Sequence, residues 1–409
     1  MKWPLAKFED VALQMKGAIV SGPFGSNIGS RFFVEEGVPV IRGNNLTFGQ
    51  RRFIDEGFVY LTEAKAQEFR NCEAVAEDLV FTAAGTIGQV GIIPKDTLFE
   101  RYIISNKQLR VRCDPNKVVP LFLFLWFTTE EMRQHIIGRN NGGAVPLINL
   151  GILRSLPVPL PPKEVQQRIA DILSAYDDLI ENNRRRMALL EDAARQLYRE
   201  WFVRLRFPGH EHTRITNGVP EGWSRKTLGE LCEEVRETVK PETLEPDTPY
   251  IGLEHMPRRS ISLSEWGTAE QVTSSKHRFR EGEILFGKIR PYFHKVSVAF
   301  LDGVASSDAI VIRPLDPTHC GFVLMTVSSD PFVAVTAQTM REGSKMPRAD
   351  WKQMQSYPAP LPPAGLLDSF EISIQSIVAQ LKTLTFANQK LRAARDLLLP
   401  RLMSGEIPL

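Results

Sequence analysis

The residues best suited to recognise a ligand lie in the segment Lys288-Ile-Arg-Pro-Tyr292. An arginine can pair bidentately with guanine, a lysine can contact a phosphate, and a tyrosine can stack or hydrogen-bond. The segment that aligns with it in the first half of the chain, Ala84-Gly-Thr-Ile-Gly88, is small and uncharged. This difference favours two readers of different sequences, although a solvated strand end is an equal alternative for any single residue.

A second candidate is the glycine-rich segment Ser21-Gly-Pro-Phe-Gly-Ser26. Glycines allow the backbone to approach a ligand closely, and free N–H groups suit a phosphate. A plain turn explains the same residues equally well.

Three other motifs could do chemistry, and each is better explained without it. Gly282-Glu-Ile-Leu-Phe-Gly-Lys288 fits a Walker A loop until Ile289, which cannot bind Mg²⁺ as Ser or Thr would, and the segment aligns with a strand. Glu63-Ala-Lys65 lacks the Pro-Asp of a nuclease motif and suits an exposed helix start after Thr62. His210-Glu-His212 lies in a polar linker without a third ligand. With no Asn-Pro-Pro-aromatic tetrad either, we expect no catalytic residue and no metal site.

Composition excludes several classes of protein. The chain has 409 residues, enough for two to four domains, and a net charge of only +2, so any basic groove must be local. Its four cysteines lie far apart without a C-x-x-C motif, which is typical of a reduced cytosol. No signal peptide or membrane-spanning apolar run is present, and we expect a cytoplasmic protein.

The elements that must position these residues occur twice. Ser105 and Ser306, Pro146 and Pro347, and the proline-rich segments 156–162 and 357–363 share an offset of 201 residues. In the first unit, short apolar runs predict strands at 38–42, 78–82, 90–93 and 108–112, and residues 120–137 predict a helix. Residues from 220 to about 362 repeat this plan, with a glycine-rich turn before each shared proline.

After each globular unit comes a long heptad pattern. Apolar residues alternate at spacings of four and three from Ile169 to Trp201 and from Phe370 to Leu402, interrupted in these seams only by Asn183, Asn388 and Arg395. Sustained a/d spacing predicts a coiled coil, and a polar seam residue fixes its alignment. Two amphipathic helices on separate domains are the alternative. Because the first helix leaves one unit and enters the other, a paired second helix must run antiparallel to it, giving a pseudo-two-fold repeat.

These features together resemble the specificity (S) subunit of a Type I restriction–modification system over nearly the whole chain. The matching segments are Ser21-Gly-Pro-Phe-Gly-Ser26, residues 156–162 before Gln166-Gln-Arg-Ile-Ala170, Phe207-Pro-Gly-His-Glu211 with Pro220-Glu-Gly-Trp223, Lys288-Ile-Arg-Pro-Tyr292, and 398–406. One departure is that Ala364-Gly-Leu-Leu-Asp-Ser369 lacks the Glu-Gln that usually opens the second helix.

The resemblance implies a mixed α/β fold with two target-recognition domains separated by a long antiparallel two-helix coiled coil. The expected boundaries are 1–160 for the first recognition domain, 161–205 for the first helix, 206–362 for the linker and second recognition domain, and 363–409 for the second helix. The expected function is non-catalytic: to bind a bipartite, asymmetric duplex DNA target and to scaffold two methyltransferase (M) subunits and, where present, restriction (R) subunits. AdoMet, ATP and Mg²⁺ then belong to those partners, and this chain binds no cofactor.

The site residues that we expect fall into two sets. Candidate DNA contacts are Ser21, Gly22, Gly25, Ser26, Arg42, Asn45, Thr86, Lys107, Asn140 and Asn141 in the first unit, and Lys288, Arg290, Tyr292, Ser344, Lys345 and Arg348 in the second. Candidate subunit-interface residues on the helices are Ile169, Leu173, Ile180, Leu190, Ile374, Leu381, Leu391 and Leu398.

Two other classes of function are compatible with the sequence. One is the recognition half of a nuclease–methyltransferase. Met1 and the ending Ser404-Gly-Glu-Ile-Pro-Leu409 count against this class, because they favour a complete chain. The other is a two-lobed scaffold that binds peptides rather than DNA.

Overall fold

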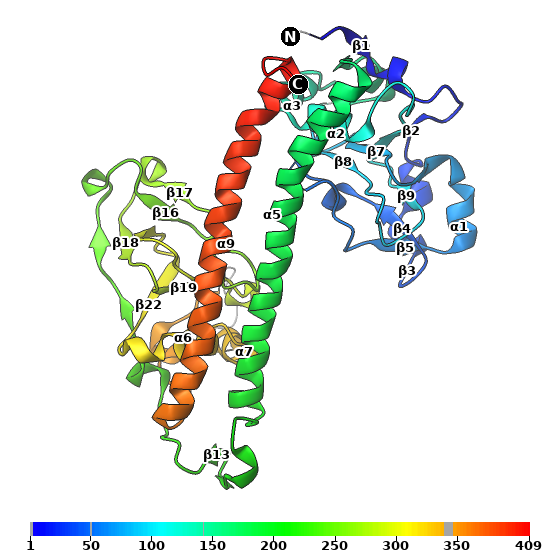
Figure 1. The fold of residues 1–409 in the computed structure, drawn as a ribbon. Coiled ribbons are helices and arrows are strands. Elements are labelled where there is room, and N and C mark those ends of the chain that lie inside the picture. The colour runs from blue at the N-terminus through cyan, green and yellow to red at the C-terminus, as the bar shows by residue number, and fades with distance from the viewer. Residues whose placement is uncertain (1–2, 50, 142, 339–346) are drawn as a thin grey trace. The chain divides into compact units, whose positions relative to one another are not determined.

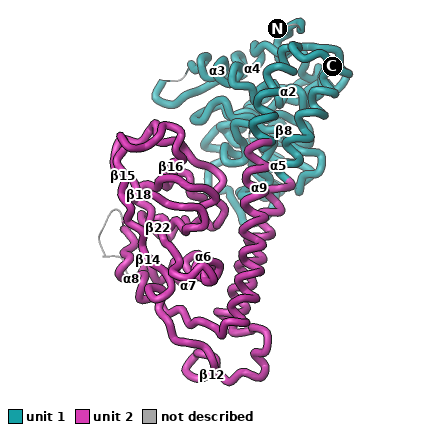
Figure 2. The backbone as a smooth tube through the Cα atoms, turned by 60° about the vertical axis from the view of Figure 1, so that its left-hand side comes forward, with its two compact units in different colours: residues 1–181, 391–409 teal, residues 182–390 magenta. Residues whose placement is uncertain are grey.

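The computed structural model of the chain describes residues 3–49, 51–141, 143–338 and 347–409 (Figure 1). It divides into two compact units, one formed by residues 1–181 with 391–409 and the other by residues 182–390 (Figure 2). The two long helices, α5 (Lys163–Tyr198) and α9 (Ala364–Ser404), contribute residues to both units.

The first unit contains a four-stranded antiparallel sheet in the order β2-β10-β7-β8 and a five-stranded sheet in the order β3-β5-β4-β9-β6. The first has strands Ile19–Ser21, Gln108–Val111, Leu79–Thr82 and Val90–Ile92. The second has Phe33–Val34, Val59–Leu61, Val38–Ile41, Tyr102–Ile104 and Glu73–Ala74, with β4 and β9 parallel. Strands β1 (Leu5–Lys7) and β11 (Pro157–Pro159) form a separate pair. The strands predicted at 38–42, 78–82, 90–93 and 108–112 correspond to β4, β7, β8 and β10, and each predicted end is confirmed to within one residue.

The second unit repeats this topology except for one edge strand: β3 pairs with β5 in the first unit, whereas β15 pairs with β18, the counterpart of β6, in the second. Its four-stranded sheet has the order β14-β22-β19-β20, with strands Cys232–Val235, Ala309–Pro314, Ile284–Gly287 and Val296–Val298. Its five-stranded sheet has the order β15-β18-β21-β16-β17, with strands Thr238–Val239, Lys276–Phe279, Gly303–Ala305, Pro249–Ile251 and Gly267–Thr268. Strands β16 and β21 are parallel, as β4 and β9 are. A small hairpin of β12 (Ile215–Thr216) and β13 (Val219–Pro220) precedes these sheets.

The sequence repeat therefore reflects a structural one. Ser105 and Ser306 follow equivalent parallel strands, and their N–H groups donate to Ile41 O at 2.9 Å and Ile251 O at 2.8 Å, respectively. An ion pair with a buried carboxylate is duplicated as well: Arg112 Nε contacts Asp78 Oδ1 at 2.9 Å, and Arg313 Nε contacts Glu283 Oε1 at 2.5 Å.

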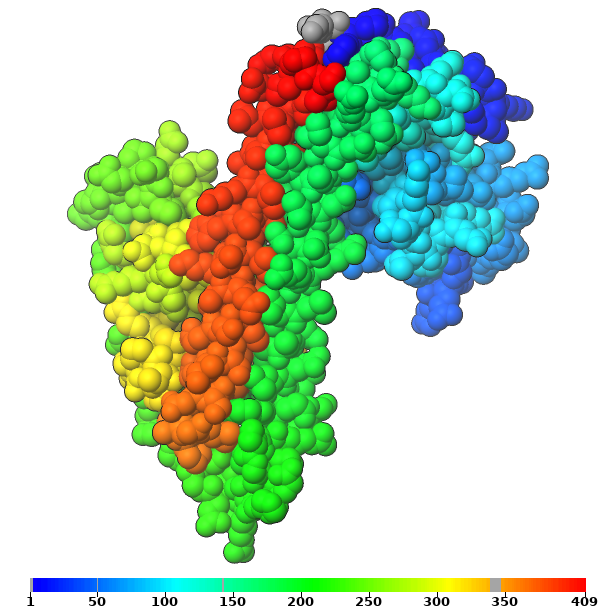
Figure 3. Space-filling model, in the orientation of Figure 1, coloured from blue at the N-terminus to red at the C-terminus, as the bar shows by residue number. Residues whose placement is uncertain are grey.

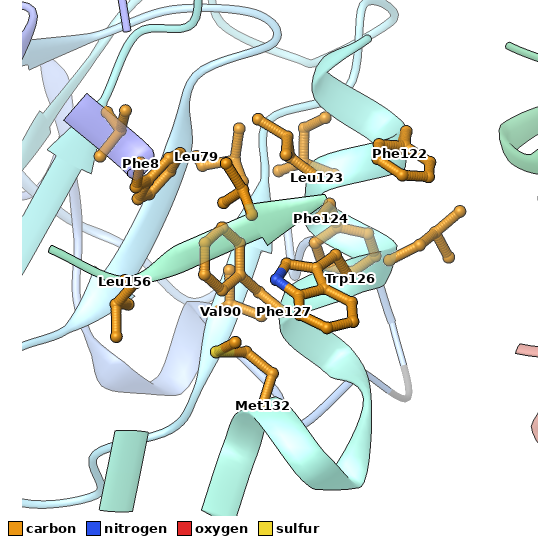
Figure 4. Close-up of a cluster of buried hydrophobic side chains, with 14 of the residues drawn as sticks. Phe8, Leu79, Val90, Phe122, Leu123, Phe124, Trp126, Phe127, Met132 and Leu156 are labelled. Atoms are coloured by element: carbon orange, nitrogen blue, oxygen red, sulfur yellow. The ribbon is translucent and has the colours of Figure 1, made fainter. Parts of the chain in front are cut away.

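An apolar helix anchors each four-stranded sheet to the long helices. In the first unit, α2 (Pro120–Thr128) is buried along almost its whole length, and its aromatic side chains pack with Phe8, Leu79 and Val90 (Figure 4). The same core includes Ile169 of α5, Leu402 of α9 and α4 (Leu150–Arg154). In the second unit, α6 (Cys320–Val327) has the corresponding position, in a core with α8 (Trp351–Met354).

The predicted helix over residues 120–137 is wrong as a single element. It breaks at Thr129, where the backbone is extended, and α3 (Glu130–Gly138) begins after it. The Thr129 side chain accepts a hydrogen bond from Met132 N at 3.3 Å, because a threonine at this position satisfies an otherwise unpaired N–H of the helix start. The second unit has the same break between α6 and α7 (Asp330–Gln338), where Ser329 Oγ accepts from Phe332 N.

The predicted antiparallel pairing of the long helices is confirmed inside each unit. In the first unit, Ile169 and Leu173 near the start of α5 share a core with Leu399 and Leu402 near the end of α9. Figure 3 shows this end of α9 (red) against the start of α5 (green). In the second unit, the order is reversed: Ala194 and Tyr198 near the end of α5 share a core with Phe370 and Ile374 near the start of α9.

All three polar interruptions of the seam are paired. Asn183 Nδ2 donates to Asn388 Oδ1 at 2.9 Å in the second unit, and Arg395 contacts Asp177 Oδ1 at 2.9 Å in the first. Because an unpaired polar group in a seam is costly, these contacts favour one alignment of the two helices.

Two further features are the state of the cysteines and the length of the apolar helices. All four cysteines are free thiols, with Cys113 and Cys232 buried. Within the described part of the chain, no single helix is long and apolar enough to cross a membrane, and Pro317–Val327 with Asp330–Gln338 meets that length only as a pair bent by 64°.

Candidate nucleic-acid interface

In the first unit, the candidate residues gather where β7 and β2 end and β8 and β10 begin. Three backbone hydrogen bonds tie the loops there together: Ala83 N to Lys107 O at 2.7 Å, Gly85 N to Pro146 O at 2.9 Å, and Gly22 N to Gln108 O at 2.9 Å. We call the segments 21–27, 83–89, 105–107 and the described residues of 140–147 (140–141 and 143–147) the strand-end loops of the first unit. The sheet thus brings four segments that are distant in sequence to one edge.

Several of the predicted side chains are exposed on these loops. Lys107, Thr86, Ser21 and Ser26 face solvent, as do Asn140 and Asn141. Asn140 Oδ1 accepts from Leu147 N at 2.8 Å, which fixes the orientation of its amide. A cation, hydroxyl groups and amides at one edge can contact phosphates and base edges.

The glycines of this edge have a different role from the predicted phosphate approach. A Cβ on Gly22 would lie 1.8 Å from Ser105 O, so no other residue fits, and the Gly22 N–H is already bonded to Gln108 O. A Cβ on Gly25 would lie 2.9 Å from Asn106 Nδ2. Gly22 is required for packing of its loop against the backbone of Ser105, and its N–H is not available to a phosphate, whereas Gly25 faces only the end of the Asn106 side chain.

The prediction for Asn45 is wrong. Its side chain is fully buried; Oδ1 accepts from Arg42 N at 2.9 Å, and Nδ2 donates to Ile54 O and Glu56 O at 2.9 and 3.0 Å. These three hydrogen bonds hold the buried side chain inside the unit, so it cannot reach DNA. The neighbouring Arg42 is half-buried and directs its guanidinium to Gly57 O at 3.5 Å.

The second unit has equivalent strand-end loops at residues 236–237, 252–259, 288–295, 306–308 and 347–349. Lys288 N donates to Asp308 O at 2.7 Å and Arg290 N donates to Pro347 O at 2.9 Å, as Gly85 N does to Pro146 O in the first unit. Tyr292 is 50% exposed and packs edge-on against Phe293. Ser344 and Lys345 lie outside the described residues.

Arg290 occupies an unusual backbone conformation. Its φ is 50°, a left-handed value that costs a non-glycine residue free energy, whereas the equivalent position in the first unit is Gly85 with φ 92°. The guanidinium is exposed, and no ion pair to it is found among the described residues. The same turn therefore contains a glycine in the first unit and a strained arginine in the second.

Charged side chains at this edge of the second unit form ion pairs and shift the pKa of a neighbouring histidine. Arg348 lies 3.6 Å from Asp308, and Arg236 binds Glu234 through two nitrogens at 2.9 and 2.6 Å. Burial lowers the pKa of His277, Glu234 opposes that shift, and the charges of Lys288 and Arg236 lower it further. Burial also lowers the pKa of Lys295.

Sequence reasoning missed several residues at these edges. Arg236 lies beside the candidates in the second unit, Arg258 stacks over the Phe293 ring at 3.9 Å, and the exposed Asn106 contacts the segment of Gly25. No spacing signal could have found them, because each comes from a separate loop that only the sheets bring to the edge.

The helix residues proposed for a subunit interface are mostly inside the chain's own seam. Ile169, Leu173, Ile374 and Leu381 are fully buried, and Ile180 is 3% exposed. Leu190, Leu391 and Leu398 are partly buried. They cannot offer a partner much surface. The apolar side chains that do face solvent on the same helices are Leu179, Leu189, Ile372 and Leu397, which are 51–72% exposed.

The motifs that we discounted have structural roles. Residues 284–287 form β19, which is paired on both sides, so this segment is a strand as predicted and not a phosphate loop. Thr62 caps α1 (Glu63–Glu68), as expected for a helix start. His210 Nδ1 contacts Phe207 O at 2.8 Å within a short turn. Among the residues that the structure describes, no group of three or more His, Cys, Asp or Glu side chains could hold a metal ion.

Comparison with known proteins finds similar sequences and folds. The family model described as "Type I restriction modification DNA specificity domain" matches residues 34–192. The MjaIX specificity subunit of Methanocaldococcus jannaschii is 23% identical over 99% of this chain and 93% of its own length. The HindI specificity subunit of Haemophilus influenzae is 20% identical over 76% of this chain and 83% of its own.

A solved structure agrees in fold. The S subunit of a Type I system from M. genitalium superposes with a TM-score of 0.58 at 15% identity, covering 98% of this chain and 96% of that one. The chain is thus similar to Type I restriction–modification specificity subunits in sequence over nearly its whole length and in fold.

Proposed function

We propose that each unit reads one half of a bipartite, asymmetric duplex DNA target through its strand-end loops. The observation that carries this proposal is the turn shared by Gly85 and Arg290. Both residues are left-handed, and both donate their N–H to the carbonyl of the shared proline. One scaffold therefore presents a bare backbone in one unit and a strained, exposed guanidinium in the other, as expected of two readers with different sequence preferences.

The side chains of the loops suit both kinds of DNA contact, to phosphates and to base edges. Lys107 and Lys288 are positioned to neutralise phosphates, which fix register without reading sequence. Arg290 and Arg348 have the fork geometry to pair with guanine, and the amides of Asn140 and Asn141 can pair with adenine. Asp308 beside Arg348 can accept from a cytosine amino group.

For the partners, we propose that the exposed apolar side chains of α5 and α9 dock the methyltransferase subunits. Isolated leucines on a surface are ordinary, but four strongly exposed aliphatic residues on paired helices offer an apolar surface for helix packing. Restriction subunits join this assembly where they exist. AdoMet, ATP and Mg²⁺ act in the partners, the chain itself catalyses no reaction, and the complex works on DNA in the cytoplasm.

A salt titration of DNA binding tests the recognition step. The chain with its methyltransferase partner should bind duplex DNA with an affinity that falls steeply with salt, because each neutralised phosphate contributes a log–log slope of about −0.9. Lys107→Ala should reduce the magnitude of the slope by about one. Lys95→Ala is the matched control: Lys95 is exposed and pairs with Glu77 at the opposite end of β7 and β8. Salt-independent binding, or equal effects of the two variants, would contradict the proposal.

A further inference from the structure

The second unit contains a cavity that is lined partly by its strand-end loops, through Arg259 and His294, and partly by helices. Its volume is about 490 Å³, and it lies between the end of α5 with the following turn, the segment at Arg259 and His294, and the corner between α6 and α7. We call it the arginine pocket. Volumes of roughly 300–1,000 Å³ are typical of sites for small organic ligands.

The lining carries a strong excess of positive charge. Arg195, Arg199, Arg204 and Arg259 contribute guanidinium groups, and the carboxylate among the described lining residues is that of Asp330. Asp330 holds Arg259 at 3.0 Å and lies 3.5 Å from His294 Nδ1. Arg195 and Arg204 have partners on their own helix, Glu191 at 3.4 Å and Glu200 at 2.5 Å. Arg199 is exposed and has no ion pair within the described ranges, so its charge is available to an anion.

Three departures from regular backbone meet at this pocket. Arg199–Val203 is a π-helical turn, a feature often found at functional sites. Arg259 and His294 are both left-handed, with φ values of 55° and 54°, and Arg259 N donates to His294 O at 2.8 Å. Such a conformation is strained for a non-glycine residue and persists only where its surroundings hold it.

Hydrogen bonds from neighbouring residues hold the segments of Arg259 and His294 in this conformation. Glu191 Oε1, on a buried side chain, accepts from Ser260 Oγ at 2.7 Å and from Ser262 N at 3.1 Å, which fixes the segment that follows Arg259. His294 Nε2 contacts Ser328 O at 2.7 Å. The guanidinium of Arg259 is therefore presented from a rigid base.

Apolar groups complete the pocket beside the cations. Tyr198 and Met325 are buried, and Val203 and Pro331 are exposed at its surface. The Tyr198 hydroxyl is bonded to Thr326 Oγ1 at 3.2 Å, so its ring edge is fixed. A ligand that fits this lining has an anionic group and an apolar, planar body, because guanidinium groups bind phosphates bidentately and also stack on flat rings.

We propose that the arginine pocket binds a nucleoside phosphate. The phosphate lies against Arg199 and Arg259, and the base and sugar lie between Val203 and Pro331. This site uses none of the residues that the sequence predicts to contact DNA, although Arg259 and His294 belong to the strand-end loops of the second unit. It gives the specificity subunit a means to respond to a soluble nucleotide.

Calorimetric titration of the purified full chain tests the proposal, with AMP and GMP as probes and inorganic phosphate and adenosine as comparisons. At least one nucleotide should bind saturably at a single site and more tightly than phosphate or adenosine. Arg199→Ala should weaken binding about 10-fold or more, since a charge-assisted hydrogen bond is lost. The matched control is Arg206→Ala: Arg206 is exposed, shares Glu200 with Arg204 and does not line the pocket.

Four results would overturn the proposal. The first is the absence of saturable nucleotide binding by a chain whose thermal unfolding is cooperative. The second is equal binding by the wild type and Arg199→Ala. The third is displacement of the nucleotide by duplex DNA together with a matching loss of DNA affinity in Arg199→Ala, which would assign the arginines to the DNA interface. Phosphate binding as tightly as a nucleotide would likewise exclude the nucleoside contact.

Discussion

Replacing Glu371 by alanine should destabilise the second unit strongly. Glu371 lies on α9, is 7% exposed, and accepts from Gly321 N at 2.8 Å and Phe322 N at 2.7 Å at the start of the buried helix α6. These N–H groups have no partner within their helix, because the first turn of a helix lacks acceptors. A Cβ on Gly321 would lie 2.8 Å from Glu371 Oε2, so the carboxylate fits closely over the helix end.

The expected cost follows from these two contacts. Each buried N–H left without an acceptor costs about 1–3 kcal/mol, so Glu371→Ala should lower the free energy of unfolding of the second unit by about 2–6 kcal/mol. Urea denaturation followed by hydrogen exchange, read on α6 peptides, measures this cost for the second unit separately from the first. Asp368→Ala, an exposed carboxylate on the same helix, is the control and should change the free energy by less than about 0.5 kcal/mol. Equal effects of the two variants would refute the capping argument.

The same carboxylate makes a prediction about pH. Burial raises the pKa of Glu371, although its two backbone hydrogen bonds oppose the shift. A raised folded-state pKa means that this contribution to stability is complete below the ordinary carboxyl pKa of about 4.3 and is lost as pH rises through the raised value. The stability of the wild type relative to Glu371→Gln should therefore fall between about pH 4 and neutrality. A rise over that range would show that the hydrogen bonds outweigh burial.

Two further predictions concern the DNA target. Replacing Lys288, Arg290 and Tyr292 together by alanine should alter one half of the target and leave the other half unchanged, with about 1–3 kcal/mol lost per base-edge pair; equal changes in both halves would contradict separate readers. Inserting one heptad after Met187 and one after Asn388, which face each other at 4.0 Å, keeps the seam in phase and lengthens each helix by about 10 Å. The unread spacer in the target should then grow by up to about three base pairs, as methylome sequencing would report; an active variant with an unchanged spacer would show that the helices do not set it.

The long helices and the repeat could be predicted because they depend on periodicity. The heptad spacing identified the seam, and Asn183 and Asn388 were placed in it correctly. The same pattern could not say which helix residues face a partner. Residues such as Ile169 and Ile374 were assigned to a subunit interface, but the seam itself buries them. A periodic apolar stripe shows that a face is covered, and it does not show by what.

The missing Glu-Gln at the start of the second helix illustrates a different limit. In the first unit, Gln166 from the matching motif accepts from Val119 N at 2.9 Å at the start of α2. The second unit makes the equivalent contact from Glu371, further along its helix, so the motif is absent and its function is retained. The sequence also could not show that Asn45 is buried or that Arg290 is left-handed, because both depend on loops that are joined only by the folded sheets.

The central claim is that this chain selects a split DNA target for a partner that modifies it. The most direct measurement is to combine the purified chain with its methyltransferase partner and AdoMet, and to map every methylated position on genomic DNA. The account predicts one asymmetric motif in two parts with an unread spacer of fixed length, and no methylation by either protein alone at that motif. Methylation without a bipartite motif, or methylation by this chain without a partner, would contradict it.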